Sequence, residues 1–184
     1  MLDREERFVY LYASHYGRVA AAQGVFAARL AWADRDEPAG KVEVWSDGVW
    51  LPPRDIAPRG QAPQWDFPVG TSLWPPTRPF HDGQTDADVF WGPSIHWNTY
   101  LERYVMLLNR AGDEQYTQDG IYVSYAASLD QPRAWSRPSR LIEGGEWYPQ
   151  AVGLDPGTGT DRLAGRYARL FVTGRSSLLL RFER

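Results

Sequence analysis

The sequence contains no cysteine, no long apolar run and no excess of positive charge, and each absence excludes a class of site or partner. Without cysteine the chain has no disulfide framework, no thiolate metal site and no cysteine nucleophile. No run approaches the roughly 18 apolar residues of a membrane span, and the charged opening MLDREERF lacks the apolar core of a signal peptide. The net charge of −3 and pI near 5.6 offer no basic surface. We therefore expect neither nucleic acid nor a membrane as partner, and the sequence assigns no cellular compartment.

Aromatic residues, glycine and proline are all abundant. The 184 residues include 9 Trp, 10 Tyr and 7 Phe, together with 17 Gly and 14 Pro. Aromatic side chains favour the pleated surface of strands, whereas glycine and proline favour turns. The composition therefore indicates an all-β fold with many short strands, in a chain whose length suits one domain.

Strand-like runs separated by turn residues fall into three blocks. The predicted strands are 6–17, 24–32 and 41–45 in the first block, 88–98, 103–111, 120–128 and 135–143 in the second, and 146–156, 166–174 and 177–184 in the third. Between the first two blocks, residues 51–87 are rich in proline, which cannot donate to a sheet ladder. We expect this stretch to cross a face of the protein as a connector or lid.

The order of elements repeats along the chain. The spacings from Trp91 to Trp147 and from Tyr104 to Ala168 both fall in the range of one propeller blade with insertions. The sequence thus predicts a partial β-propeller of about two and a half antiparallel four-stranded blades, built as a single domain. Its parts are a partial blade without an innermost strand at 1–50, the connector at 51–87, a complete blade at 88–143 and the last blade at 144–184.

Three segments carry a resemblance to a known group of enzymes. They are DVFWGPSIHWN with RYVMLLNRA, EWYPQAVGLDPGTGTD, and the S-x-D-x(4)-W pattern at Ser128, Asp130 and Trp135. Together they resemble the five-bladed propellers of glycoside hydrolase family 43 and the related family 32. The resemblance implies catalytic carboxylates on the innermost strands of the first three blades, where one acid protonates the leaving oxygen and a second assists attack. Those strands would precede Met1, so no catalytic residue is carried over to this chain.

The resemblance implies a fragment of a glycosidase-like propeller that hydrolyses or binds oligosaccharides in its intact form and is not catalytic alone. The alternative is a non-catalytic module for binding carbohydrate or protein, completed by a partner or by a second copy, since symmetric closure would bury the open edge. Carbohydrate is the expected ligand in both cases, and the expected partner is a set of N-terminal blades or a second copy. The residues themselves predict no cofactor, and calcium enters only through the resemblance.

The inner strands of the last two predicted blades supply the candidate binding residues. Period-two alternation on 88–98 places Phe90, Gly92, Ser94, His96 and Asn98 on one face, and Val89, Trp91, Pro93, Ile95 and Trp97 on the other. Near the start of the third block, acidic, aromatic and amide side chains follow one another. The candidates for contact with sugar are Asp88, Trp91, Ser94, His96, Glu146, Trp147, Tyr148 and Gln150.

Each candidate also has a purely structural interpretation. His96 would contact sugar or help to hold a cation, or it would bond a neighbouring backbone carbonyl. Asp88 and Glu146 stand where a carboxylate reaches sugar hydroxyls, but acidic residues at strand entries also stabilise turns. The tryptophans would stack on sugar faces or pack between blades, with Trp147 the best candidate for stacking. His15 and His81 lie in predicted loops, where we expect solvated side chains.

Overall fold

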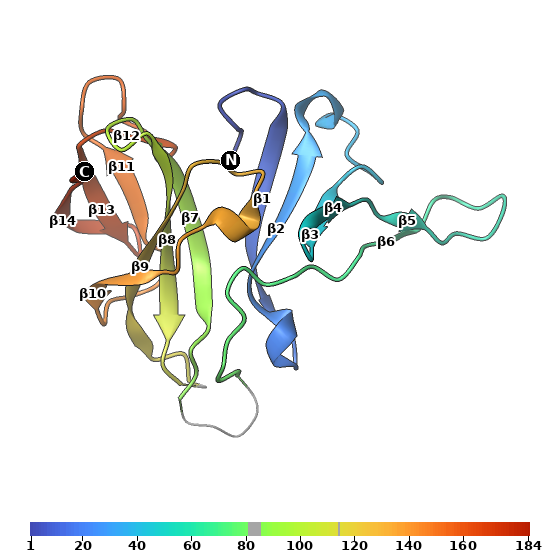
Figure 1. The fold of residues 1–184 in the computed structure, drawn as a ribbon, viewed down its shortest axis with the longest axis horizontal. Helices are drawn as coiled ribbons and strands as arrows, with labels where there is room; N and C mark the ends of the chain where they lie inside the picture. The colour runs from blue at the N-terminus through green and yellow to red at the C-terminus, as the bar shows by residue number, and fades with distance from the viewer. Residues whose placement is uncertain (81–85, 114) are drawn as a thin grey trace.

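The computed structural model describes residues 1–80, 86–113 and 115–184, and in these residues the chain is all-β. The strands form three main sheets and one two-stranded hairpin, and the helical segments are short 3-10 turns: η1 (Ala20–Ala22), η2 (Trp32–Asp34) and η3 (Pro132–Ala134). The three sheets follow one another across the molecule in chain order (Figure 1). No helix in the described part of the chain has the length and apolar character to cross a membrane.

The first sheet is an antiparallel meander in the order β1-β2-β3-β4. Its strands are β1 (Phe8–Tyr16), β2 (Gln23–Ala31), β3 (Glu43–Ser46) and β4 (Val49–Leu51). The prediction of three strands was one short, because Asp47 and Gly48 both adopt positive φ and turn the chain straight back into β4. An Asp-Gly pair is a preferred two-residue hairpin loop, because its left-handed backbone matches the twist of the flanking strands.

The central sheet has the order β10-β9-β8-β7-β12. Its antiparallel strands β7 (Phe90–Asn98), β8 (Arg103–Ala111), β9 (Gln118–Ala126) and β10 (Ser139–Glu143) confirm the predicted second block to within a few residues. The parallel strand β12 (Leu163–Ala164) was predicted as part of a turn. It pairs with the end of β7, so the third block is hydrogen-bonded to the second.

The third sheet is antiparallel in the order β11-β13-β14, with β11 (Gln150–Gly153), β13 (Tyr167–Val172) and β14 (Arg175–Arg181). Apolar side chains fill both sides of the central sheet. Tyr104, Met106 and Leu108 face the first sheet and pack with Tyr10 and Val25. The alternate residues of β8, Val105 and Leu107, face the third sheet. They pack with Ile121 of β9 and with Ala168 and Leu170 of β13. This two-sided burial explains why β8 is a nearly continuous apolar run.

The proline-rich stretch first makes a short hairpin and then returns across the first sheet. The hairpin, β5 (Arg54–Asp55) with β6 (Trp65–Asp66), projects away from the sheets (Figure 1). Further along, Leu73 N donates to Val25 O, and the buried Gln23 side chain exchanges two hydrogen bonds with the backbone of Phe80. The stretch therefore has few ladder hydrogen bonds of its own and is held against the first sheet by its backbone.

A β-bulge in β7 corrects the predicted division of its two faces. Trp91 lies opposite Asn109 and Ser94 opposite Leu107, so Gly92 and Pro93 together face the single residue Leu108. The extra residue reverses the alternation beyond it. Trp91 consequently shares a face with Ser94, His96 and Asn98, while Phe90 lies on the other face with Ile95 and Trp97.

Candidate functional site

Four separate segments line one open cleft, and three of them contribute aromatic side chains. Its volume is about 400 Å³, and its walls come from the end of β1, the bulge in β7, the β8–β9 connection and the loop before β11. The residues that line it are Ser14, Tyr16, Gly92, Tyr116, Trp147 and Tyr148. The cleft therefore lies where the first sheet, the central sheet and the loop that leads into the third sheet meet.

The buried Trp91 ring supports the cleft from below. Tyr16 stacks on it with ring centroids 3.9 Å apart and planes at 10°, and the Phe80 ring packs against it at 5.2 Å. Because Trp91 is 0% exposed and Tyr16 is 50% exposed, the tyrosine presents its outer face to solvent. Trp91, a candidate for sugar contact, therefore fixes the position of Tyr16 and does not line the cleft.

Two aromatic residues of the cleft are held in an unusual backbone conformation. Tyr116 and Tyr148 both have φ of +62°, a left-handed region that residues other than glycine adopt rarely. Such strain costs on the order of 1 kcal/mol or more and is concentrated at binding and active sites. Tyr148 is 70% exposed, so hydrophobic burial of its ring does not explain why it is placed there.

A buried asparagine anchors the loop that carries Trp147 and Tyr148. Asn109 on β8 is 0% exposed, its Nδ2 donates to Glu146 O at 2.9 Å, and its Oδ1 accepts from Tyr148 N at 3.0 Å. Asn109 Nδ2 also donates to Gln118 Oε1 at 3.0 Å. One side chain of the central sheet therefore sets the backbone on both sides of Trp147.

The floor of the cleft depends on a small residue and a hydroxyl. Gly92 lies in the bulge with φ of +62°, and a Cβ at this position would meet Asn109 Oδ1 at 3.3 Å. Gly92 N donates to Ser14 Oγ at 2.9 Å, which connects the floor to β1. A side chain at Gly92 would strain the backbone and crowd the Asn109 amide that holds the loop before β11.

The phenol groups give the cleft a polar rim. Burial raises the pKa of Tyr16 above its ordinary value, and the nearby phenols of Tyr116 and Tyr148 act in the same direction. The Tyr16 hydroxyl therefore stays protonated at neutral pH. A side-chain hydrogen bond with Ser14 acts in the opposite direction on this pKa, so the hydroxyl is already bonded to Ser14 and keeps only part of its hydrogen-bonding capacity for a ligand.

The predicted carboxylates are engaged in structural contacts. Asp88 accepts hydrogen bonds from Thr77 Oγ1 and from Arg78 N, which ties the end of the connector to the start of the central sheet. The Glu146 carboxylate accepts from Thr173 Oγ1, a contact between the loop before β11 and the turn after β13. Both contacts fit the turn-stabilising interpretation of these residues.

The remaining candidates lie outside the aromatic cleft. Gln150 is exposed on β11 opposite Phe171, and Ser94 lines a separate cavity of about 240 Å³ beside Tyr10 and Tyr12. His15 is exposed, as predicted, but it lies on β1 opposite Gly24 and not in a loop, with Nδ1 2.6 Å from Ala22 O. His81 lies outside the described residues.

His96 is buried in an apolar environment. Its side chain is 1% exposed, the Phe182 ring lies 5.9 Å away, and burial lowers its pKa to about 4. Its Nε2 has no hydrogen-bond partner among the described residues, which also contain no group of three or more His, Asp or Glu side chains suited to a metal ion. His96 is therefore a neutral residue of the protein interior and is not exposed to a ligand in the cleft.

Of the eight candidates, Trp147 and Tyr148 line the cleft and Trp91 supports it. Ser14, Tyr16, Asn109 and Tyr116 were missed. The pattern of β1 could have found two of them, since Tyr10, Tyr12, Ser14 and Tyr16 alternate onto one face. Comparison of the chain with protein-family models, with curated proteins and with solved structures finds no match.

Proposed function

We propose that this protein binds carbohydrate in the cleft formed by Tyr16, Tyr116, Trp147 and Tyr148. The observation that carries the proposal is the convergence of three exposed tyrosine rings and the partly buried Trp147 ring, from distant parts of the chain, on one cavity of about 400 Å³. A volume of this size lies within the range of about 300–1,000 Å³ typical of small-molecule sites. The neighbouring hydroxyls of Ser14 and the tyrosines supply hydrogen-bonding groups at its edge.

The chemistry of the cleft suits a sugar because it combines flat apolar surfaces with neutral hydroxyls. An aromatic ring covers the C–H face of a pyranose or furanose, and phenol groups exchange hydrogen bonds with the hydroxyls at its edge. The Tyr16 ring is fixed by its stack on Trp91, so little rotamer entropy is lost when a ligand packs on it. The expected ligand is the end of an oligosaccharide, with pentose or fructose units first to be tested.

The proposal is for binding and not for hydrolysis by this chain. Glycoside hydrolysis uses a pair of carboxyl groups on either side of the scissile bond. The described residues that line the cleft include no Asp or Glu, and the nearby Glu146 carboxylate is bonded to Thr173. As part of the proposal, the meanders β1–β4 and β7–β10 and the sheet β11-β13-β14 are taken as blades of a partial propeller, completed by further blades or by a second copy.

Titration of the protein with arabino-, xylo- and fructo-oligosaccharides by calorimetry tests the proposal. At least one series should bind, and Trp147→Ala and Tyr148→Ala should each weaken it by about tenfold, as expected for loss of a stacked ring. The matched control is Trp32→Ala, which removes a partly exposed ring at the opposite end of the β1–β2 pair. Equal affinities for Trp147→Ala and Trp32→Ala, or no binding in any series, would refute the proposal.

A further inference from the structure

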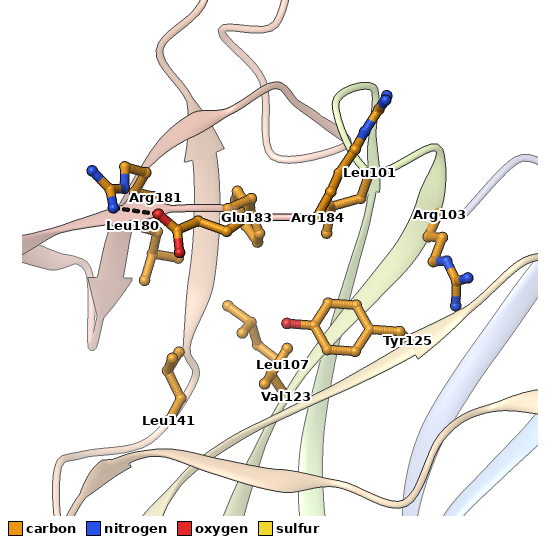
Figure 2. A pocket seen from close by; sticks show the side chains of 11 residues that line it. Leu101, Arg103, Leu107, Val123, Tyr125, Leu141, Leu180, Arg181, Glu183 and Arg184 are labelled. Atoms are coloured by element: carbon orange, nitrogen blue, oxygen red, sulfur yellow. Dashed lines mark hydrogen bonds and ion pairs between the residues drawn. The ribbon is translucent and has the colours of Figure 1, made fainter.

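A second cavity of about 560 Å³ lies between the central sheet and the C-terminal strand β14, away from the aromatic cleft. Its floor is formed by Leu107 on β8 and Val123 on β9, which pair directly and are 1% and 7% exposed. Leu141 and Leu180 lie at the opposite side of the cavity from Arg103 (Figure 2). The cavity therefore has an apolar floor and one apolar end.

The other end of the cavity is polar. Tyr125 pairs with Val105, so Arg103, two residues earlier on β8, is its diagonal neighbour on the same face of the sheet. Figure 2 shows the Tyr125 hydroxyl directed toward the middle of the cavity, with Arg103 on the far side of the ring. Burial raises the pKa of Tyr125, which keeps the phenol protonated as a hydrogen-bond donor.

The positive charge of Arg103 is not compensated within the described part of the chain. Its guanidinium has no carboxylate partner there, whereas the neighbouring Arg181 is paired with Glu183. Arg184 donates two hydrogen bonds to Tyr100 O and is directed away from the cavity in Figure 2. Among the described residues, Arg103 is thus the cation that this cavity offers to a ligand, and the Tyr125 ring lies between it and the middle of the cavity.

We propose that this cavity binds a small amphipathic carboxylate, such as a medium-chain fatty acid. The carboxylate pairs with the Arg103 guanidinium, on the side of the Tyr125 ring opposite to its hydroxyl. Its alkyl chain lies over Leu107 and Val123 toward Leu141 and Leu180. A planar guanidinium suits a carboxylate because it offers two parallel donors, and the charge complementarity selects an anion over a neutral chain of equal length.

Calorimetric titration of the whole protein with hexanoate, octanoate and decanoate tests this site. Affinity should rise along the series, by up to about fourfold for each buried methylene. Octan-1-ol should bind at least tenfold more weakly than octanoate, because it cannot form the charged contact. If octanoate does not bind, or binds no better than octan-1-ol, the proposal is wrong.

A substitution and its control locate the carboxylate. Arg103→Gln should weaken octanoate binding about tenfold. The control is Arg59→Gln, an equal change of net charge at an exposed residue of the β5–β6 hairpin loop. Arg103 is itself exposed, so its replacement should leave the circular dichroism spectrum unchanged. If Arg103→Gln and Arg59→Gln bind octanoate equally well, the assignment is overturned.

Trp147→Ala should retain octanoate binding, which separates this site from the aromatic cleft.

Discussion

Tyr16 at the end of β1 stacks on Trp91 of β7, with ring centroids 3.9 Å apart and planes at 10°. The two residues lie far apart in sequence and come from different sheets. The Trp91 ring is buried and the Tyr16 ring is half exposed. The stack on the buried ring therefore restricts the motion of Tyr16 at the surface. This contact, the bulge at Gly92, the hydrogen bonds of Tyr12 and the burial of His96 each have a measurable consequence.

Removing the buried partner should lower stability and binding together. Trp91→Ala leaves a cavity beneath Tyr16 and should reduce the free energy of unfolding by about 3–5 kcal/mol, measured by urea denaturation. Tyr16→Phe keeps the stacked ring and should change stability by less than about 1 kcal/mol. If the two variants are equally stable, the Trp91 ring does not support the cleft.

The glycine in the bulge should resist substitution. Gly92→Ala places a Cβ at positive φ and against Asn109 Oδ1, so we expect a loss of about 1–2 kcal/mol and weaker carbohydrate binding. Gly112→Ala is the control, because its φ is not positive and its nearest neighbour to a Cβ, in Asp119, lies 3.7 Å away. Thermal unfolding of both variants measures the difference. A Gly92→Ala protein as stable as Gly112→Ala would contradict the strained geometry of the bulge.

The hydroxyl of Tyr12 on β1 should stabilise the packing of the first sheet against the β9–β10 connection of the central sheet. Tyr12 Oη accepts from Trp135 Nε1 at 3.1 Å and donates to Leu129 O at 3.0 Å. Tyr12→Phe leaves both groups without this partner, and the free energy of unfolding should fall by about 1–3 kcal/mol. Tyr148→Phe removes an exposed hydroxyl and should have little effect on stability. Equal denaturation midpoints for the two variants would show that the Tyr12 hydrogen bonds do not stabilise the interface.

His96 should make stability depend on pH. Its pKa is about 4 in the folded chain, below the ordinary value of 6.5, so the unfolded chain binds the proton more tightly. The contribution of neutral His96 to the free energy of unfolding is complete above about pH 6.5 and is lost as the pH falls toward 4. The whole contribution is roughly 3 kcal/mol. Denaturation across this range should show the loss, and His96→Gln should remove that part of it. An imidazole that titrates near pH 6.5 in NMR spectra of the folded protein would contradict the prediction.

The strands were predictable because their signals are local. The run RYVMLLNRA forms β8, and the aromatic and β-branched runs around it form β7 and β9, since strand length and turn residues can be identified within a short window. The fourth strand of the first sheet also had a local signal, in the Asp47-Gly48 pair that precedes it. Trp147 and Tyr148, which were chosen for their place near the start of the third block, both line the aromatic cleft.

The division of faces on β7 could not be predicted, because a bulge depends on how one strand pairs with its neighbour. A single extra residue at Gly92 moved Trp91 to the face of His96 and buried both side chains. The same limit applies to Tyr116, which reaches the cleft through a turn whose backbone conformation has no simple sequence signal.

The sequence by itself determined the all-β class, the order of the main strands and the aromatic content that a binding surface needs. Tertiary structure decided which aromatic rings share a cleft and which are buried, and it placed Arg103 beside Tyr125 in a separate cavity. The physical reason is the distance along the chain between the residues that decide each feature. Strand formation follows from neighbouring residues, whereas burial and the convergence of side chains depend on the packing of one sheet against the next.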